Sequence, residues 1–274
     1  MFFDRPKPQA PRPRPACDAE SGIAAIMLVL LIMAAVAGLI AMVFAHTALQ
    51  SHQALLRNQQ SYLDRGQSLL GNWYKANAAY VFTSAGQATL QNSGALLQAA
   101  GIPEEWNATA TESAETCTSQ PGGGNPICYY NLTLSIPGGN LSASISGETI
   151  EAKKFGQAVS QLDRMAAALQ AGFSAFTASG GLHNTSLNWF APPNCGSNGS
   201  GPFACSNGGF MSLDGWLANS GFGPESDGNN PWGVPVLAEN DGGNANDQVS
   251  PYSIILESPL PWGGAIQQTV TQPL

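Results

Sequence analysis

An uncharged apolar run, Ile23–Phe44, limits what this chain can fold into more than any other feature. As a helix it would be about 33 Å long, enough to cross a bilayer core of about 30 Å. The core of a signal peptide is shorter and ends at a small-residue cleavage site, whereas here the helical pattern continues. A soluble domain seldom buries so long an uncharged stretch. We therefore expect a retained transmembrane helix over residues 23–44, rather than a signal peptide or a buried core helix.

The basic residues lie mainly on one side of this run. Four of the ten precede it, namely Arg5, Lys7, Arg12 and Arg14, and the next is Arg57. The positive-inside rule places residues 1–22, a leader rich in Pro and Arg, in the cytoplasm. Everything after Ala45 is then outside. We expect a single-pass inner-membrane protein with a periplasmic head.

The charge distribution excludes one class of partner. The formal net charge is −8, and no Lys or Arg follows Arg164. A nucleic-acid binder needs a basic surface to neutralise phosphates. We therefore expect no nucleic-acid binding.

A heptad of leucines continues the helical pattern beyond the apolar run. Leu49, Leu56, Leu63 and Leu70 recur every seven residues, with polar residues on the other faces. This predicts an amphipathic helical stalk over residues 45–82. We expect its outer half to pack on its own domain. The inner half has no obvious partner within the chain, and neighbouring copies in a filament would supply one.

The rest of the chain predicts an α+β fold. We expect a head at residues 83–190 and a C-terminal region rich in Gly, Asn and Ser, with some strands, at 191–274. In the head, a polar loop reaches Pro126, and alternating residues then predict an antiparallel hairpin of 130–136 with 141–145. Apolar residues at helical spacing predict a second helix over about 151–178. The candidate strands of the C-terminal region are Val234–Leu237, Tyr252–Leu256 and Ala265–Val270.

Four of the five cysteines follow the apolar run as two close pairs, and Cys17 precedes it. An even number on the outer side of a membrane fits two disulfides in an oxidising compartment. We expect Cys117 to pair with Cys128 and Cys195 with Cys205, although four cysteines allow three connectivities. Free thiols and a zinc site are the alternatives, but no CxxC motif is present.

The sequence contains no recognisable catalytic motif. A Ser-His-Asp arrangement would have to use His183, which has no nucleophile elbow nearby. No phosphate-binding loop is present either. Trp106, Trp189, Trp216, Trp232 and Trp262 could face a sugar or a receptor, but such residues more often fill a core. We expect a protein that is not an enzyme and that holds no cofactor or metal.

The layout of a basic leader, an apolar helix that becomes a stalk, and a disulfide-bonded α+β head resembles the type IV pilin superfamily. It is most similar to the PilV-type minor pilins of type IVb and conjugative thin pili. The residues that carry the resemblance are Glu20-Ser21-Gly22-Ile23-Ala24-Ala25, which lead into the apolar helix, and Gly180-Gly181 followed by Trp189. The resemblance covers about residues 16–190.

The resemblance implies processing by a prepilin peptidase, which cuts the leader after a glycine. Alignment places the cut between Pro15 and Ala16, where Pro15 stands in place of that glycine. Cleavage after Gly22, leaving Ile23 as the first residue, is the alternative. Glu20 matches the family's glutamate, which pairs with a cation near the membrane because an unpaired carboxylate is costly there. An ordinary charge at a helix start is the other interpretation of Glu20.

The expected function is therefore that of a minor pilin or pilus-tip subunit. Its partners would be other pilin subunits, the prepilin peptidase, the inner membrane, and a host or recipient-cell surface receptor. After assembly the head would lie on an extracellular pilus and serve adhesion or assembly initiation. The alternatives are a type II secretion pseudopilin and a static membrane-anchored periplasmic binding protein or enzyme.

Overall fold

The computed structural model describes residues 19–120, 124–137, 141–178, 190, 211–212, 228–240 and 252–272. The chain divides into two compact units, residues 1–58 and residues 59–274. We call residues 59–274 the globular unit.

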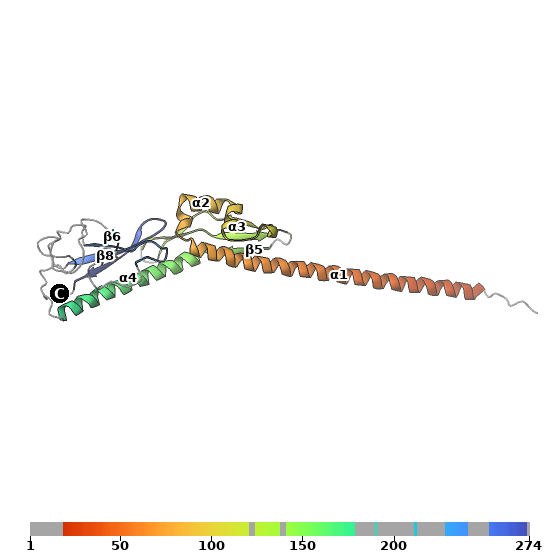
Figure 1. Ribbon diagram of the computed structural model, residues 1–274. Coiled ribbons are helices and arrows are strands. Elements are labelled where there is room, and N and C mark those ends of the chain that lie inside the picture. Colours follow the sequence, from red (N-terminus) through yellow and green to blue (C-terminus); the bar gives the residue numbers. More distant parts are fainter. Residues whose placement is uncertain are drawn as a thin grey trace, which may run out of the picture. The chain divides into compact units, whose positions relative to one another are not determined.

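A single long helix, α1, spans Ala19–Ala76 and contains 58 residues (Figure 1). It begins in the first unit and ends in the globular unit. Asn77 follows its last residue, and the Asn77 side-chain amide donates to the Trp73 carbonyl at 2.9 Å. This bond satisfies one of the carbonyls that a helix end leaves without an intrahelical partner. The predicted continuation of the apolar helix into an amphipathic helix is confirmed.

Two short helices and two 3₁₀ turns follow α1. They are η1 (Tyr80–Phe82), α2 (Ser84–Gln91), α3 (Ser93–Ala99) and η2 (Glu104–Trp106). Thr83 caps α2 by accepting a hydrogen bond from the Gly86 amide, and Asn92 caps α3 by accepting one from the Ala95 amide, both at 3.1 Å. Such caps favour helix starts even where the apolar pattern is short.

The described strands form three antiparallel sheets. The first contains β1 (Thr109–Glu112), β4 (Leu132–Ile136) and β5 (Leu141–Ile145), the second contains β2 (Thr116–Thr118) and β3 (Ile127–Tyr129), and the third contains β6 (Met211–Ser212), β7 (Leu237–Asn240), β8 (Ser253–Pro259) and β9 (Ala265–Thr271). An α+β layout with small antiparallel sheets, as predicted, is therefore present.

The predicted hairpin is confirmed as β4 and β5. Leu132 pairs with Ile145 and Ile136 pairs with Leu141. Along β4, buried residues alternate with half-buried ones. This alternation places one face of the sheet against a core and leaves the other partly open.

Two sequence predictions about loops and strands were wrong. The segment from Glu104 to Pro126 was expected to be a polar loop, yet it contains β1 and β2. The predicted strand Val234–Leu237 is displaced, because β7 begins only at Leu237 and Pro235 makes an isolated bridge with Asn229. Proline has no amide hydrogen for a strand ladder, which explains the late start.

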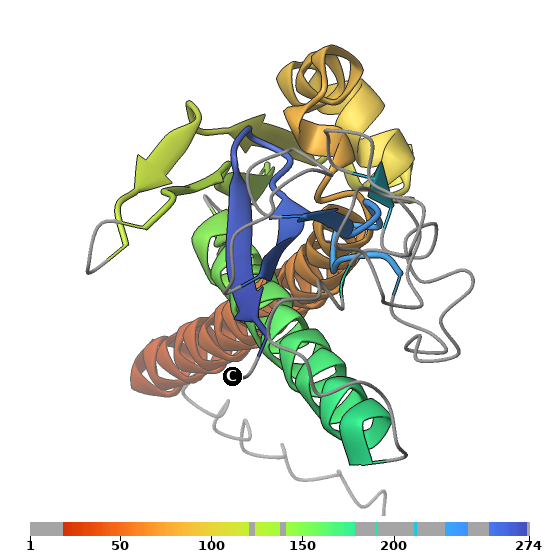
Figure 2. The same cartoon turned by 90° about the vertical axis from the view of Figure 1, so that its left-hand side faces the viewer.

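The second long helix, α4, spans Gly147–Ala178 and begins four residues before its predicted start. The Ser146 hydroxyl accepts a hydrogen bond from the Thr149 amide at 3.2 Å, which caps this earlier start. The buried face of α4 packs against the third sheet, and Figure 2 shows blue strands of that sheet beside the green helix. This core contains five residues of the predicted face, namely Leu162, Met165, Ala166, Leu169 and Phe173. The helix of the predicted head therefore shares a core with strands of the predicted C-terminal region.

Candidate functional site

The first half of α1 presents apolar side chains to its surroundings. Every described side chain from Ile26 to Asn58 is exposed. The apolar window has a mean hydropathy of 3.0, and this is the one described helix that is long and apolar enough to cross a membrane. Exposed apolar side chains on this scale require either lipid or another protein surface around them.

Only some of the predicted processing residues lie within the described part of the chain. Glu20, Gly22 and Ile23 lie in the first two turns of α1, which begins at Ala19. Pro15 and Ala16 lie outside the described residues. The described backbone therefore continues the helix through the predicted glutamate and through the alternative cleavage position.

The leucine heptad divides as predicted. Leu49 is 61% exposed and Leu56 is 37% exposed, whereas Leu63 is 4% exposed and Leu70 is fully buried. The two buried leucines join a core formed with the first sheet, α2 and α3. At Gly66, an added Cβ would lie 2.5 Å from the Leu134 side chain, so α1 and β4 approach closely here. The outer half of the stalk is part of the globular unit, and the inner half exposes its leucines.

One predicted disulfide is present. Cys117 on β2 and Cys128 on β3 face each other across the strand pair and are bonded. Glu115 lies close to both sulfurs, but bonded cysteines offer no thiolates to a metal. Cys195 and Cys205 lie outside the described residues, so their pairing stays a prediction.

Replacing both Cys117 and Cys128 by serine is expected to lower the free energy of unfolding by about 2–3 kcal/mol, because the bond closes a short loop in the unfolded chain. Urea unfolding of the full-length chain in mild detergent would measure the loss. Reducing the wild-type protein should lower the free energy of unfolding by at least as much, because reduction also opens the predicted Cys195–Cys205 bond. An unchanged unfolding midpoint in both experiments would show that the disulfide does not stabilise the globular unit.

A buried carboxylate joins segments that are far apart in the sequence. Glu151 on α4 is fully buried, and one of its oxygens accepts a hydrogen bond from the Trp232 indole at 2.8 Å. The other oxygen has no hydrogen-bond partner among the described residues. The hydroxyl of Tyr74, near the end of α1, also interacts with this carboxylate and accepts a hydrogen bond from the Tyr130 amide at 3.2 Å. We call Tyr74, Glu151 and Trp232 the buried triad.

The surroundings favour the neutral form of this carboxylate. Burial raises the pKa of Glu151 to about 7, and the Trp232 hydrogen bond, the positive charge of Lys154 and the Tyr74 hydroxyl oppose this only in part. Burial also lowers the pKa of Lys154, whose ammonium donates to the Pro231 carbonyl at 2.6 Å. Desolvation therefore dominates in the buried triad.

A buried asparagine organises the loop that carries Trp232. The Asn230 side-chain amide donates to Ser258 at 3.1 Å and to the Pro259 carbonyl at 2.8 Å. Its side-chain oxygen accepts hydrogen bonds from the backbone amides of Trp232 and Val234. Full satisfaction of a buried side chain makes such a loop rigid. The loop therefore holds a fixed position beside α4.

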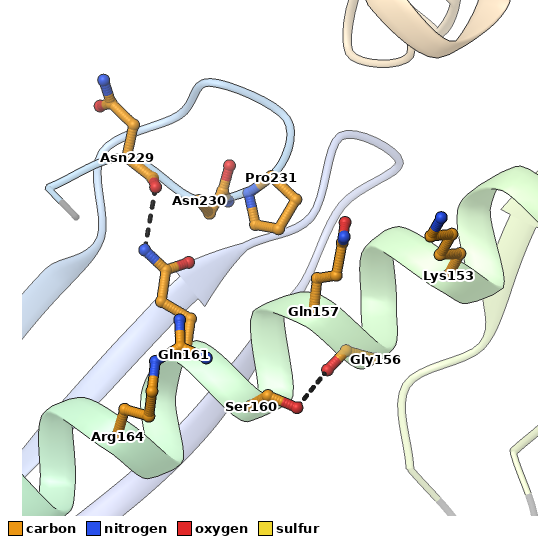
Figure 3. A pocket seen from close by; sticks show the side chains of 9 residues that line it. All are labelled: Lys153, Gly156, Gln157, Ser160, Gln161, Arg164, Asn229, Asn230 and Pro231. Atoms are coloured by element: carbon orange, nitrogen blue, oxygen red, sulfur yellow. Dashed lines mark hydrogen bonds between the residues drawn. The ribbon is translucent and has the colours of Figure 1, made fainter. Parts of the chain in front are cut away.

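An open groove of about 640 Å³ lies between α4 and this loop (Figure 3). Its described lining residues have polar side chains apart from Gly156 and Pro231. The lining residues are Lys153, Gly156, Gln157, Ser160, Gln161, Arg164, Asn229, Asn230 and Pro231. The buried Gln161 amide donates to the Asn229 carbonyl at 2.9 Å and ties the loop to the helix. Sequence analysis missed this groove because its two sides are more than sixty residues apart.

Gly156 stands in the interior of α4 and is exposed. An added Cβ would meet nothing within 4 Å, so alanine would fit at this position. Glycine inside a helix costs about 0.5–1 kcal/mol relative to alanine. Packing among the residues that the structure describes therefore does not explain the glycine.

Three of the tryptophans considered as candidates for ligand contact are described, and they pack against other side chains of the globular unit. Trp106 and Trp232 are buried, and Trp106 stacks on Tyr62 with ring centroids 5.0 Å apart. The half-buried Trp262 meets Trp232 edge to face and donates to the Pro126 carbonyl at 2.8 Å. Trp189 and Trp216 lie outside the described residues. Because Trp106 and Trp232 are buried, these two residues do not support the alternative that the tryptophans face a sugar or a receptor.

The chain matches no protein-family model, and neither a curated protein nor a solved structure matches it.

Proposed function

We infer that the chain is a minor pilin or pilus-tip subunit of a type IV pilus. The observation that carries this proposal is the single helix α1. Its apolar first half is exposed along its whole described length, and its last turns belong to the core of the globular unit. A lipid bilayer would cover the apolar half before assembly, and the helices of neighbouring subunits would cover it in a filament.

The proposal also accounts for the two halves of the leucine heptad. A static membrane anchor requires an apolar span, but anchoring does not explain exposed leucines beyond that span. Leu49, Leu55 and Leu56 are exposed and follow the predicted transmembrane residues. Helices that associate side by side bury such residues at helical spacing. Neighbouring subunits in a filament would supply the missing contacts.

Filament recovery tests this function. The full-length chain with a C-terminal tag would be expressed beside a type IVb pilus system, and sheared filaments would be separated from membranes. Detection of the tag along or at the end of filaments is the expected result. A chain found only in the membrane, in cells that make filaments, would favour the static anchored protein. A chain confined to a short periplasmic assembly would favour the secretion pseudopilin.

With the leader cut between Pro15 and Ala16, Glu20 stays in the chain, and its replacement by glutamine is expected to reduce the amount of the chain in sheared filaments about tenfold, while the amount in the membrane stays the same. The proposed reason is that Glu20 pairs with a cation of a neighbouring subunit near the bilayer, and a pairing energy of about 1.4 kcal/mol corresponds to a factor of ten. Quantitative immunoblots of both fractions measure the ratio. The matched control is Glu104→Gln on the globular unit. Equal filament recovery of both variants would contradict the assigned role of Glu20.

A further inference from the structure

The groove between α4 and the loop at 229–231 is lined by positive charges, whereas the globular unit as a whole has a net negative charge. Of the ten basic side chains in the chain, five precede residue 59, and of the eighteen acidic ones, three do. The globular unit therefore carries five basic and fifteen acidic side chains. Two of the five, Lys153 and Arg164, line the groove, and its described lining contains no carboxylate. Such a local reversal of charge favours an anionic ligand.

The spacing of the two cations suits an extended ligand. Lys153 and Arg164 are eleven residues apart on α4, which corresponds to roughly 16 Å along a helix. Gln157 and Ser160 lie between them on the same face, and Figure 3 shows these side chains along the helix, with the loop at Asn229 opposite. A ligand lying along the groove would meet a cation near each end and hydrogen-bonding groups between them.

The chemistry of the lining favours a sugar over a protein. Amide and hydroxyl side chains both donate and accept hydrogen bonds, as sugar hydroxyls do. Protein interfaces depend on buried aromatic and aliphatic anchors, and the described lining offers only Pro231 as an apolar side chain. The volume of about 640 Å³ lies in the usual range for small ligands.

Gly156 adds an independent observation. It lines the groove, it is exposed, and space for a side chain is available at its Cα. Because glycine has no side chain, a ligand can lie against the helix backbone at this position. Any larger side chain there would occupy the groove without disturbing the packing of the globular unit.

We propose that this groove binds an acidic oligosaccharide, a chain of uronic acid type, with Lys153 and Arg164 holding its carboxylates and Gln157 and Ser160 its hydroxyls. Gly156 gives the sugar chain access to the helix backbone. The use of the groove for adhesion rests on the proposed function above, whereas the binding itself does not.

Calorimetric titration of the full-length chain in mild detergent tests the proposal. The probe is a tetrasaccharide of galacturonic acid, and the neutral comparison is maltotetraose. We expect saturable binding of the acidic probe that weakens as salt is raised, because salt screens exposed charges. We expect at least about tenfold weaker binding of the neutral sugar, since it lacks the charge-assisted hydrogen bonds. Equal binding of both sugars, or no binding of the acidic one, would overturn the proposal.

Two variants and two matched controls locate the site. Lys153→Gln and Gly156→Leu are each expected to weaken binding of the acidic probe about tenfold or more. The controls are Lys75→Gln, a cation outside the groove, and Ala171→Leu, an exposed position farther along α4. Both controls should bind as the wild type does. Binding that survives both groove variants would place the sugar elsewhere and refute the assignment.

The folding of the variants is checked separately. Gly156→Ala is expected to raise the melting temperature by about 2–4 °C, because alanine favours the helix. Gly156→Leu should unfold no earlier than the wild type. Recovery of Gly156→Leu in sheared filaments should equal that of the wild type, so loss of sugar binding is distinguishable from loss of assembly. A lower melting temperature of both glycine variants would show that Gly156 serves packing rather than a ligand.

Discussion

Replacing Leu70 by alanine is expected to lower the free energy of unfolding of the globular unit by about 2–5 kcal/mol. Leu70 is fully buried and belongs to the same core as Leu132 and Leu134 of β4. Alanine is the strongest helix former, so the loss cannot come from a weakened α1. It would come from the cavity and from the apolar surface that no longer leaves water. Urea unfolding of the full-length chain in mild detergent measures it.

Leu49→Ala is the matched control, because it makes the same substitution three heptads earlier in the same helix. Leu49 is 61% exposed, so its replacement leaves no cavity in the chain. We expect its unfolding free energy to stay within about 0.5 kcal/mol of the wild type. Similar losses at both positions would show that the inner half of the stalk also packs within the chain. The filament would then not be needed to cover it.

Replacing Glu151 by glutamine is expected to change the pH dependence of stability. The unfolding free energy of the variant minus that of the wild type should be about 3 kcal/mol larger at pH 8 than at pH 4. The pKa of Glu151 is raised to about 7 by burial, from an ordinary value of 4.5. Between these two values the folded protein holds the proton and the unfolded chain does not. The stabilisation from the neutral carboxyl is therefore complete below pH 4.5 and is lost as the pH rises through 7. Glutamine stays neutral throughout and still offers an oxygen to Trp232.

The measurement compares the two proteins at several pH values between 4 and 8, because other groups change the stability of both equally. Glu148→Gln, at an exposed position in the first turn of α4, is the control. Its difference from the wild type should not follow this pH dependence. A constant difference between Glu151→Gln and the wild type over the whole range would show that Glu151 is charged in the folded protein.

The elements with long, regular patterns could be predicted from the sequence. The uncharged run and the leucine heptad predicted α1, because a helix repeats every 3.6 residues and a long pattern leaves little ambiguity. Alternation in β4 and the apolar spacing of α4 were equally clear. In β4, α4 and the later half of α1, one face of the element meets one core, and the apolar half of α1 is marked by its uncharged run alone. Local sequence therefore contains the information.

The missed elements are short, or they depend on distant partners. The strands β1 and β2 have four and three residues, and β2 is exposed throughout, so neither shows a usable alternation. The caps Thr83 and Asn92 could have indicated α2 and α3, because these residues favour helix starts. The buried triad and the groove could not be foreseen, because they bring the end of α1 and α4 to the loop at Trp232. Such contacts are set by tertiary packing and not by local pattern.

We propose that α1 serves as a membrane helix first and as a filament helix afterwards. The most direct test of this proposal is the intact mass and N-terminal sequence of the chain recovered from native membranes and from sheared filaments. The account predicts a chain in the filaments that starts at Ala16 or at Ile23, with its apolar helix retained. A chain that still starts at Met1 and occurs only in the membrane would contradict the account and favour a static membrane-anchored protein.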